Sequence, residues 1–214
     1  MNFNDNIDFY GVFNFKSIDA DGNVLDEYKE KNLIMDAARN NMAQLVGGVT
    51  TGGDTSAGLS INKFVLGTRG HVGTDILDAQ QVGESDVDKP ASDRTFDSQR
   101  SDLFSEAISG SVNYRIDFDA TGDNDVTLTV DGQRYEAGTV VGAIENGNTV
   151  RRVVSGRTVT YTVTVPVDNA NDANPLAYTE AALYAGAEIF SMKTFPARIK
   201  ENTVKFEISW SIIF

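Results

Sequence analysis

The last eleven residues of the sequence, Val204–Phe214, read VKFEISWSIIF, and apolar and polar side chains alternate along them. Successive side chains of a β-strand point to opposite faces, so a period of two predicts a strand with one buried face. The apolar face carries six large residues, among them Trp210, the only tryptophan of the chain, and Ile213 alone interrupts the polar face. Because burying each such side chain contributes roughly 1.5–3 kcal/mol, we predict that this strand anchors the hydrophobic core.

The composition limits the classes of protein to which the chain can belong. Its 214 residues suit one mainly-β domain over residues 1–214. The 31 acidic residues against 18 basic ones give a net charge of −13, which argues against nucleic acid and anionic membranes as partners. Cysteine is absent, which excludes disulfides, thiolate catalysis and cysteine-ligated zinc.

The sequence shows no targeting or membrane segment. Met1–Asp8 is polar and acidic, without the basic and apolar regions of a secretory signal. No apolar run approaches the roughly 18 residues that a membrane-spanning helix needs. We therefore expect neither a secretory signal nor a membrane span, and the absence of cysteine fits a cytosolic place of synthesis.

Two strands near the N-terminus are predicted to form a hairpin. Phe9–Ile18 carries large apolar residues at alternating positions, and Val24–Lys29 returns after the turn Asp19–Asn23, whose Asp, Gly and Asn favour tight turns. Gly11 within the first strand indicates a bulge or a close approach of another group.

One amphipathic helix is predicted over Asn32–Val46. Asn32 suits the N-cap position, and Gly47-Gly48 follows the last helical residue. Its apolar stripe consists of Ile34, Ala38, Met42 and Leu45.

The rest of the chain predicts a β-sandwich with long loops. Residues 70–106 are rich in Asp, Ser, Gly and Gln and form a long loop region, which we expect to contact partner subunits. Residues 123–157 carry short strands and turns of their own and look like a β-rich insertion. Further strands are predicted at Ile61–Leu66, Ile108–Phe118, Thr158–Val167, Tyr178–Tyr184 and Glu188–Phe195, the last ended by Pro196.

No constellation of residues points to catalysis, a cofactor or a metal. His71 is the only histidine, and the chain has no Gly-x-Ser-x-Gly, Gly-x-Gly-x-x-Gly or Walker A sequence. The turn Asp19–Asn23 fails the calcium-loop pattern, because Ser17 and Tyr28 then occupy its first and twelfth positions. Spacing alone supports only weakly a cation site among Asp119, Asp123, Asp125 and Asp131.

Two blocks of the sequence resemble a loose group of structural proteins from tailed-bacteriophage virions. The first block is Lys31-Asn32-Leu33-Ile34 with the following helix, then Ile61–Thr68 (INKFVLGT). The second is Thr179–Tyr184 (TEAALY), Ile189–Pro196 (IFSMKTFP), Lys200 and Glu207–Phe214 (EISWSIIF). Residues 70–157 lie outside the resemblance.

The resemblance implies a structural role and brings no catalytic residue with it. It implies a virion component, assembled in several copies in the tail, baseplate or neck, and made in the host cytoplasm. The implied partners are other virion proteins and copies of the same chain, with no small-molecule substrate. Other readings remain: a capsid decoration or fibre-anchoring protein, a carbohydrate- or receptor-binding module with exposed aromatic residues, or a hydrolase with paired acids.

Three aromatic residues are candidates for an interface between subunits. Aromatic side chains are enriched in the cores of protein interfaces, and Tyr178, Tyr184 and Phe195 lie in or near the second block. Ordinary packing in the core of the single chain is the alternative for each of them.

Overall fold

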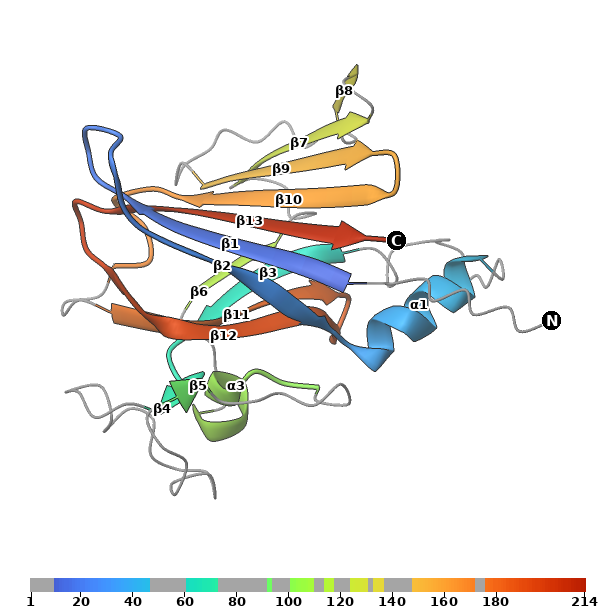
Figure 1. The fold of residues 1–214 in the computed structure, drawn as a ribbon, viewed down its shortest axis with the longest axis horizontal. Coiled ribbons are helices and arrows are strands. Elements are labelled where there is room, and N and C mark those ends of the chain that lie inside the picture. Colours follow the sequence, from blue (N-terminus) through green and yellow to red (C-terminus); the bar gives the residue numbers. More distant parts are fainter. Residues whose placement is uncertain are drawn as a thin grey trace.

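The chain folds mainly into β-strands in the computed structural model (Figure 1), which describes residues 10–46, 61–72, 92–93, 101–109, 114–117, 124–130, 133–136, 148–171 and 176–214. The elements in chain order are β1 (Tyr10–Ile18), β2 (Val24–Ile34), α1 (Asp36–Val46), β3 (Ile61–Gly67), β4 (His71–Val72), β5 (Ser92–Asp93), α3 (Phe104–Ser109), β6 (Tyr114–Asp117), β7 (Asn124–Val130), β8 (Gln133–Glu136), β9 (Asn148–Ser155), β10 (Thr158–Val165), β11 (Leu176–Ala185), β12 (Glu188–Lys200) and β13 (Lys205–Ile213).

Eleven strands form one curled sheet in the order β6-β3-β11-β12-β2-β1-β13-β10-β9-β7-β8. All described neighbours in it are antiparallel except β7 and β9, which run parallel. The two-residue strands β4 and β5 pair separately, next to β12. Strands β7, β8 and β9 lie within the predicted insertion at 123–157 and belong to the main sheet.

The C-terminal strand lies at the centre of the sheet, as its alternation predicts. β13 pairs with β1 on one side and β10 on the other, so that Trp210 lies opposite both Phe13 and Tyr161. The side chains of Phe206, Ile208, Trp210 and Ile212 are at most 1% exposed, whereas the residues between them are half-buried.

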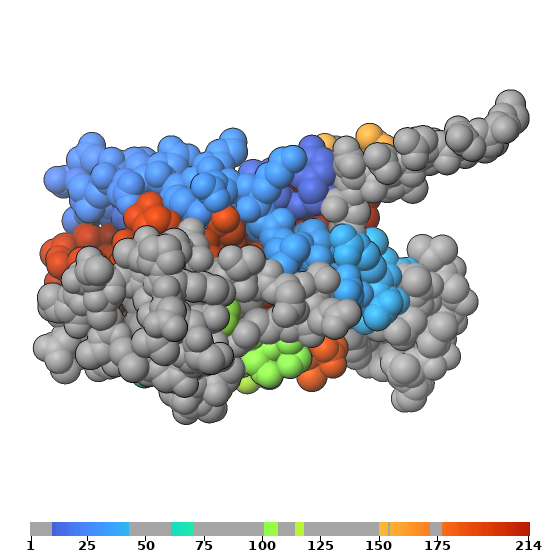
Figure 2. Space-filling model, turned by 60° about the horizontal axis from the view of Figure 1, so that its bottom comes forward, coloured from blue at the N-terminus to red at the C-terminus, as the bar shows by residue number. Residues whose placement is uncertain are grey.

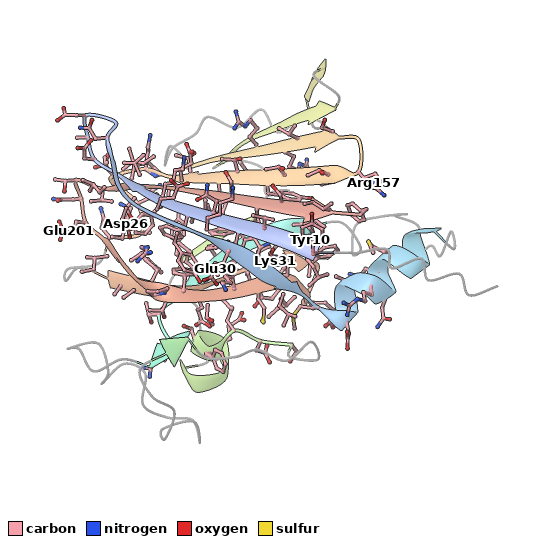
Figure 3. All side chains as sticks on the ribbon, viewed as in Figure 1. Tyr10, Asp26, Glu30, Lys31, Arg157 and Glu201 are labelled. Carbon is pink, nitrogen blue, oxygen red and sulfur yellow. The ribbon has the colours of Figure 1, made fainter. Side chains whose placement is uncertain are left out.

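The sheet curls because β2 changes partners along its length. Its earlier residues pair with β1, and only Leu33 and Ile34 pair with β12. Figure 2 shows β2 in blue alongside β12 in orange. Beyond the paired residues, ion pairs of Glu30 with Lys193 (2.7 Å) and Asp26 with Arg198 (2.9 Å) connect the two strands, and Figure 3 labels both acids.

Apolar side chains pack on both faces of the β12 half of the sheet. The main core lies between the two halves and contains residues of both, such as Phe13 and Trp210 from one and Phe64 and Phe195 from the other. A second cluster lies on the opposite face of β3, β11 and β12. It includes Met35, Val65, Leu103, Phe104, Ala182, Tyr184, Ile189 and Met192.

The predicted helix over Asn32–Val46 is wrong at its beginning, because α1 starts at Asp36. Leu33 and Ile34 are paired with β12, and the backbone N–H of Met35 donates to the carbonyl of Phe190 (3.1 Å). Asn32 is a buried residue of β2 and therefore does not cap the helix. The prediction placed the helix start too early because Ile34 fits both the apolar stripe of a helix and a buried position in β2.

Two strand boundaries also differ from the predictions. Ile108 belongs to helix α3, and the strand predicted from that residue is limited to β6 in the described part of the chain. β12 continues through Pro196, because Phe195, Pro196 and Ala197 bulge out opposite the single residue Thr179 of β11. A proline lacks the N–H of a ladder hydrogen bond, and a bulge accommodates it without loss.

Gly11 lies where another side chain approaches the backbone closely. A Cβ atom at this position would overlap the amide of Asn32 on β2, which is itself buried against Ser191. We expect Gly11→Ala to lower the free energy of unfolding by about 1–3 kcal/mol, because the buried amide must shift. Denaturant unfolding of Gly11→Ala, Asn32→Ala and the double variant measures this coupling. Full additivity of the two single effects would contradict the steric explanation.

Candidate functional site

A buried carboxylate joins three parts of the chain on the α3 side of the sheet. Glu180 of β11 is fully buried, and its oxygens accept hydrogen bonds from the backbone N–H groups of Phe104 (2.9 Å) and Ser105 (2.8 Å). The hydroxyl of Ser105 donates to the same carboxylate (2.5 Å), as does the N–H of Arg69 (3.4 Å). Glu180 therefore satisfies N–H groups at the start of α3 and after β3.

The backbone after β3 fits closely against Glu180. The N–H of Thr68 donates to the hydroxyl of Ser105 (2.9 Å), and the N–H of Gly70 donates to the hydroxyl of Thr179 (2.9 Å). A Cβ atom at Gly67 would overlap the Glu180 carboxylate, and one at Gly70 would lie 2.5 Å from the Thr179 carbonyl oxygen. Thr179 and Glu180 therefore hold the chain at both ends of the predicted loop region 70–106.

The surroundings of Glu180 act on its pKa in opposite directions. Burial raises the pKa of this carboxyl, because transfer out of water penalises the charged form. The hydrogen bonds from Ser105, Phe104 and Arg69 lower it, because every one of them is donated to the carboxylate. Burial is the larger effect, and the pKa of Glu180 lies above its ordinary value of 4.5.

A second buried polar junction connects β2, β12 and β13. The hydroxyl of Ser191 accepts a hydrogen bond from the indole N–H of Trp210 (3.1 Å) and one from the side-chain amide of Asn32. It donates to the carbonyl of Leu33 (2.9 Å). One hydroxyl thus holds the two halves of the curled sheet together at the place where β2 changes partners.

A third buried polar group stabilises the connection between β10 and β11. The Lys200 ammonium donates to the carbonyls of Val167 (3.0 Å) and Glu201 (3.1 Å) and to the side-chain oxygen of Asn171 (2.9 Å). Burial lowers the pKa of Lys200 to about 8. The hydroxyl of Tyr178 donates to the carbonyl of Ala170 in the same connection (3.0 Å).

The three aromatic interface candidates lie inside the chain. Tyr178 and Phe195 are 0% exposed and belong to the main core, where the Phe195 ring is stacked on Phe13 at 5.4 Å. Tyr184 is 3% exposed in the second cluster, its hydroxyl donates to Glu106, and Lys63 lies over its ring at 4.5 Å. We assign all three to core packing, the alternative that the sequence left open.

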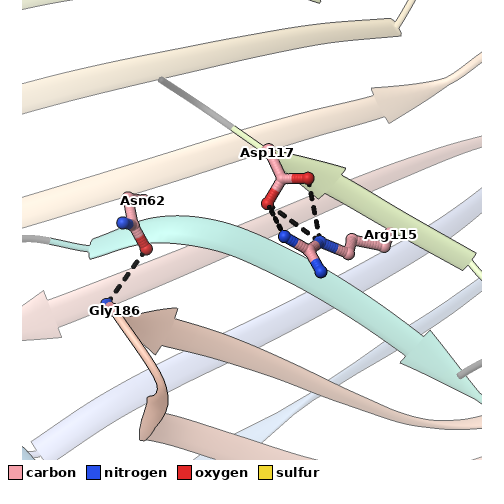
Figure 4. A network of polar contacts seen from close by, with 4 residues as sticks. All are labelled: Asn62, Arg115, Asp117 and Gly186. Carbon is pink, nitrogen blue, oxygen red and sulfur yellow. Dashed lines mark hydrogen bonds and ion pairs between the residues drawn. The ribbon is translucent and has the colours of Figure 1, made fainter. Parts of the chain in front are cut away.

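Figure 4 shows two polar contacts near the β6 edge of the sheet. Arg115 forms a bidentate ion pair with Asp117 of the same strand, β6, with its closest oxygen at 2.6 Å. The side-chain oxygen of Asn62 on β3 accepts a hydrogen bond from the N–H of Gly186 (3.1 Å), in the turn between β11 and β12. The first contact joins two side chains of one strand, and the second holds the β11–β12 turn against β3.

The part of the chain that the structure describes holds no candidate metal site. No three His, Asp or Glu side chains gather there in a way that could hold a metal ion. The carboxylate of Asp19 accepts hydrogen bonds from the backbone and side-chain N–H groups of Asn23, as expected for the hairpin turn. Asp119, Asp123 and Asp131 lie outside the described residues, as do the surroundings of the His71 side chain.

None of the helices in the described part of the chain combines the length and apolar character of a membrane span. Comparisons with known proteins find no matching family model, no matching curated protein and no matching solved structure.

The polar residues of both similarity blocks meet at these junctions. Gly67 of the first block lies against the carboxylate of Glu180 of the second, and the side-chain amide of Asn32 of the first block donates to the hydroxyl of Ser191 of the second. Reasoning from periodicity missed Glu180, Ser191 and Lys200. One signal was available for Glu180: a carboxylate inside the apolar run Leu176–Ala185 must be buried, and a buried carboxylate needs donors.

Proposed function

We propose that this protein is a structural component of a tailed-phage virion, assembled in several copies in the tail, baseplate or neck. The observation that carries the proposal is the meeting of the two similarity blocks at buried junctions. The blocks that resemble virion proteins contribute residues that hold the fold together, and such residues suit a shared structural scaffold. Fold alone does not define function, so the proposal rests on this correspondence.

The architecture that we propose for this role is a β-sandwich with α1 as an amphipathic helix packed on it. Two observations support it. The main core contains residues from both halves of the curled sheet. At the beginning of α1, Met35 and Ala38 are 0% exposed, whereas Arg39 and Asn40 are exposed. Sheet edges and loops of such a fold offer surfaces for packing into a ring or shell.

The proposed location is tested on purified particles of the phage that encodes the chain. Mass spectrometry of density-purified virions should detect the protein in a fixed ratio to the major tail or head protein. Electron microscopy with antibodies against the protein should label the tail, baseplate or neck. Absence from purified virions would refute the proposal, and label on the head would favour the capsid-decoration alternative.

The long loop is expected to serve assembly rather than folding. Deleting Thr74–Ser92 removes the pairing of Ser92 with Val72 but keeps both chain segments that are held at Thr179 and Glu180. We expect the free energy of unfolding to change by less than about 1 kcal/mol, because lengthening or shortening a loop changes its closure entropy only slightly. Incorporation into particles should fall severalfold. Normal incorporation of the deletion variant would remove the loop from the proposed contacts.

A further inference from the structure

The outer face of five strands is mostly polar and is not covered by the described helices. Along β2, β1, β13, β10 and β9, residues next to the buried ones point away from the core. At its centre Asn14, Ser209 and Thr162 lie in one row across three strands. Thr160 and Ser211 in the next row share a hydrogen bond (2.9 Å). Helices α1 and α3 contact β12 and β3 instead, on the other half of the sheet (Figure 1).

This outer face carries more basic than acidic residues although the whole chain has a net charge of −13. Its acidic residues are Glu27 and Glu207, which lie opposite Lys16 on either side in the strand register. Lys31 lies over the ring of Tyr10 at 5.2 Å, and Figure 3 shows both at the same end of the sheet. The basic residues of the face are Lys16, Lys29, Lys31, Arg151 and Lys205.

The acidic counterpart is the long loop. Residues 71–103 contain eight acidic and three basic residues. The described residues that flank the loop, Gly70 and Phe104, bond to Thr179 and Glu180 on the α3 side of the sheet, which is the side opposite the basic outer face. To cover the outer face of its own chain, the loop would have to pass around the sheet edge and return. A neighbouring copy presents the same face directly.

We propose that the outer face of β2, β1, β13, β10 and β9 binds the acidic loop 71–103 of a second copy of this chain. Lysine and arginine side chains on this face attract the loop carboxylates. The acidic loop of one copy then contacts the outer face of the next copy. Such a contact joins two different surfaces and is therefore heterologous, and it assembles copies into rings or stacks. The inference deepens the proposed function, because it names the surface through which copies assemble.

Charge reversal at the rim tests the electrostatic part of the contact. Lys29 and Arg151 are exposed, and the variant K29E/R151E replaces both. The control R39E/R115E makes the same change in charge at two exposed basic residues outside this face. Arg39 lies on α1 and Arg115 on β6, and their side chains are 54% and 53% exposed. Sedimentation velocity over a concentration series in low salt should show self-association of the parent. We expect association to weaken at least about tenfold in K29E/R151E and less than about twofold in the control.

Salt provides the second arm of this experiment. Raising the ionic strength from about 0.05 to 0.5 M should weaken association of the parent, since screening acts on exposed charges. Association that is equally strong in K29E/R151E, or a parent that remains monomeric at millimolar concentration in low salt, would overturn the inference.

Cross-linking identifies which surfaces meet, and the absence of native cysteine makes single-cysteine variants specific. Thr160→Cys marks the sheet face, and Asp88→Cys marks the loop. A mixture of the two variants, treated with a short bismaleimide, should give the mixed dimer as the main product. A dimer of Thr160→Cys alone would indicate face-to-face contact and overturn the inference. So would a link formed only within one chain of the double variant.

The outcomes for this inference and for the proposed function are separable. Presence in virions together with unchanged association of K29E/R151E would refute the loop-to-face contact and leave the virion role standing. Absence from virions together with the expected cross-link would refute the virion role and leave the contact standing.

Discussion

Trp210→Ala is expected to lower the free energy of unfolding by about 3–5 kcal/mol, the cost of a large-to-small change in a packed core. The Trp210 side chain is 1% exposed, and its ring meets Phe13 edge-on at 4.8 Å. Its indole N–H donates to Ser191, so truncation also removes one hydrogen bond from the junction of the two sheet halves. Denaturant unfolding followed by far-ultraviolet circular dichroism measures the change without relying on tryptophan fluorescence.

A conservative variant separates packing from hydrogen bonding at this position. Trp210→Phe keeps an aromatic ring on the buried face but removes the donor to Ser191, whose oxygen still accepts from Asn32. We expect a loss of about 1–2 kcal/mol, less than for alanine. If Trp210→Ala unfolded at the same denaturant concentration as the parent, the central position of β13 would be wrong.

Glu180→Ala is expected to lower the free energy of unfolding by about 2–4 kcal/mol. Its removal leaves the N–H groups of Phe104 and Ser105 buried without their acceptor, and each unsatisfied buried donor costs about 1–3 kcal/mol. The loss should be concentrated at α3 and the backbone after β3. Hydrogen exchange should therefore show faster exchange at residues 67–70 and 103–106, while β13 keeps its protection relative to global unfolding.

The pH dependence of stability tests the pKa of Glu180. Because burial raises this pKa above the ordinary value of 4.5, the folded state binds more protons than the unfolded state above that pH. The contribution of Glu180 to stability is then largest below about pH 4.5 and falls as the pH rises through the folded-state pKa.

Glu180→Gln is the matched control, since it has nearly the same shape and does not titrate. As the pH rises from 4.5, the parent should lose stability relative to the glutamine variant, because only the parent carries the titrating carboxyl. Gln has only one acceptor oxygen, so we expect the variant to be less stable than the parent at acidic pH. A shift in the opposite direction would mean that hydrogen bonding outweighs burial at this carboxylate.

Local patterns predicted the strands well and their ends less well. The alternation in β13 and β1 reports which side chains face the core, and the structure confirms both strands. The Asp19–Asn23 turn and the β1–β2 pairing follow from residues close together in the chain. The start of α1 was misjudged because the pairing of Leu33 and Ile34 with β12 is invisible to a helical period.

Contacts between residues far apart in the sequence determined the strand pairing, the β12 bulge and the burial of the aromatic candidates. The parallel pairing of β7 with β9 and the bulge that accommodates Pro196 depend on a neighbouring strand. Tyr178, Tyr184 and Phe195 were interpreted as interface candidates because a sequence does not show whether an aromatic side chain faces its own core or a partner. In the structure all three are buried, Tyr178 and Phe195 in the main core and Tyr184 in the second cluster.

The sequence by itself determined that the chain is mainly β and that its final strand is half-buried, and its net charge of −13 gives the expectation that nucleic acid is not a partner. Each of these conclusions depends on a local period or on a sum over residues. Only the tertiary structure decided where Glu180, Ser191 and Lys200 find their partners. Asn32 and Ser191 are separated by 159 residues, and Ser105 and Glu180 by 75. A buried polar group must be paired, but which group pairs with it is determined by how the sheet curls.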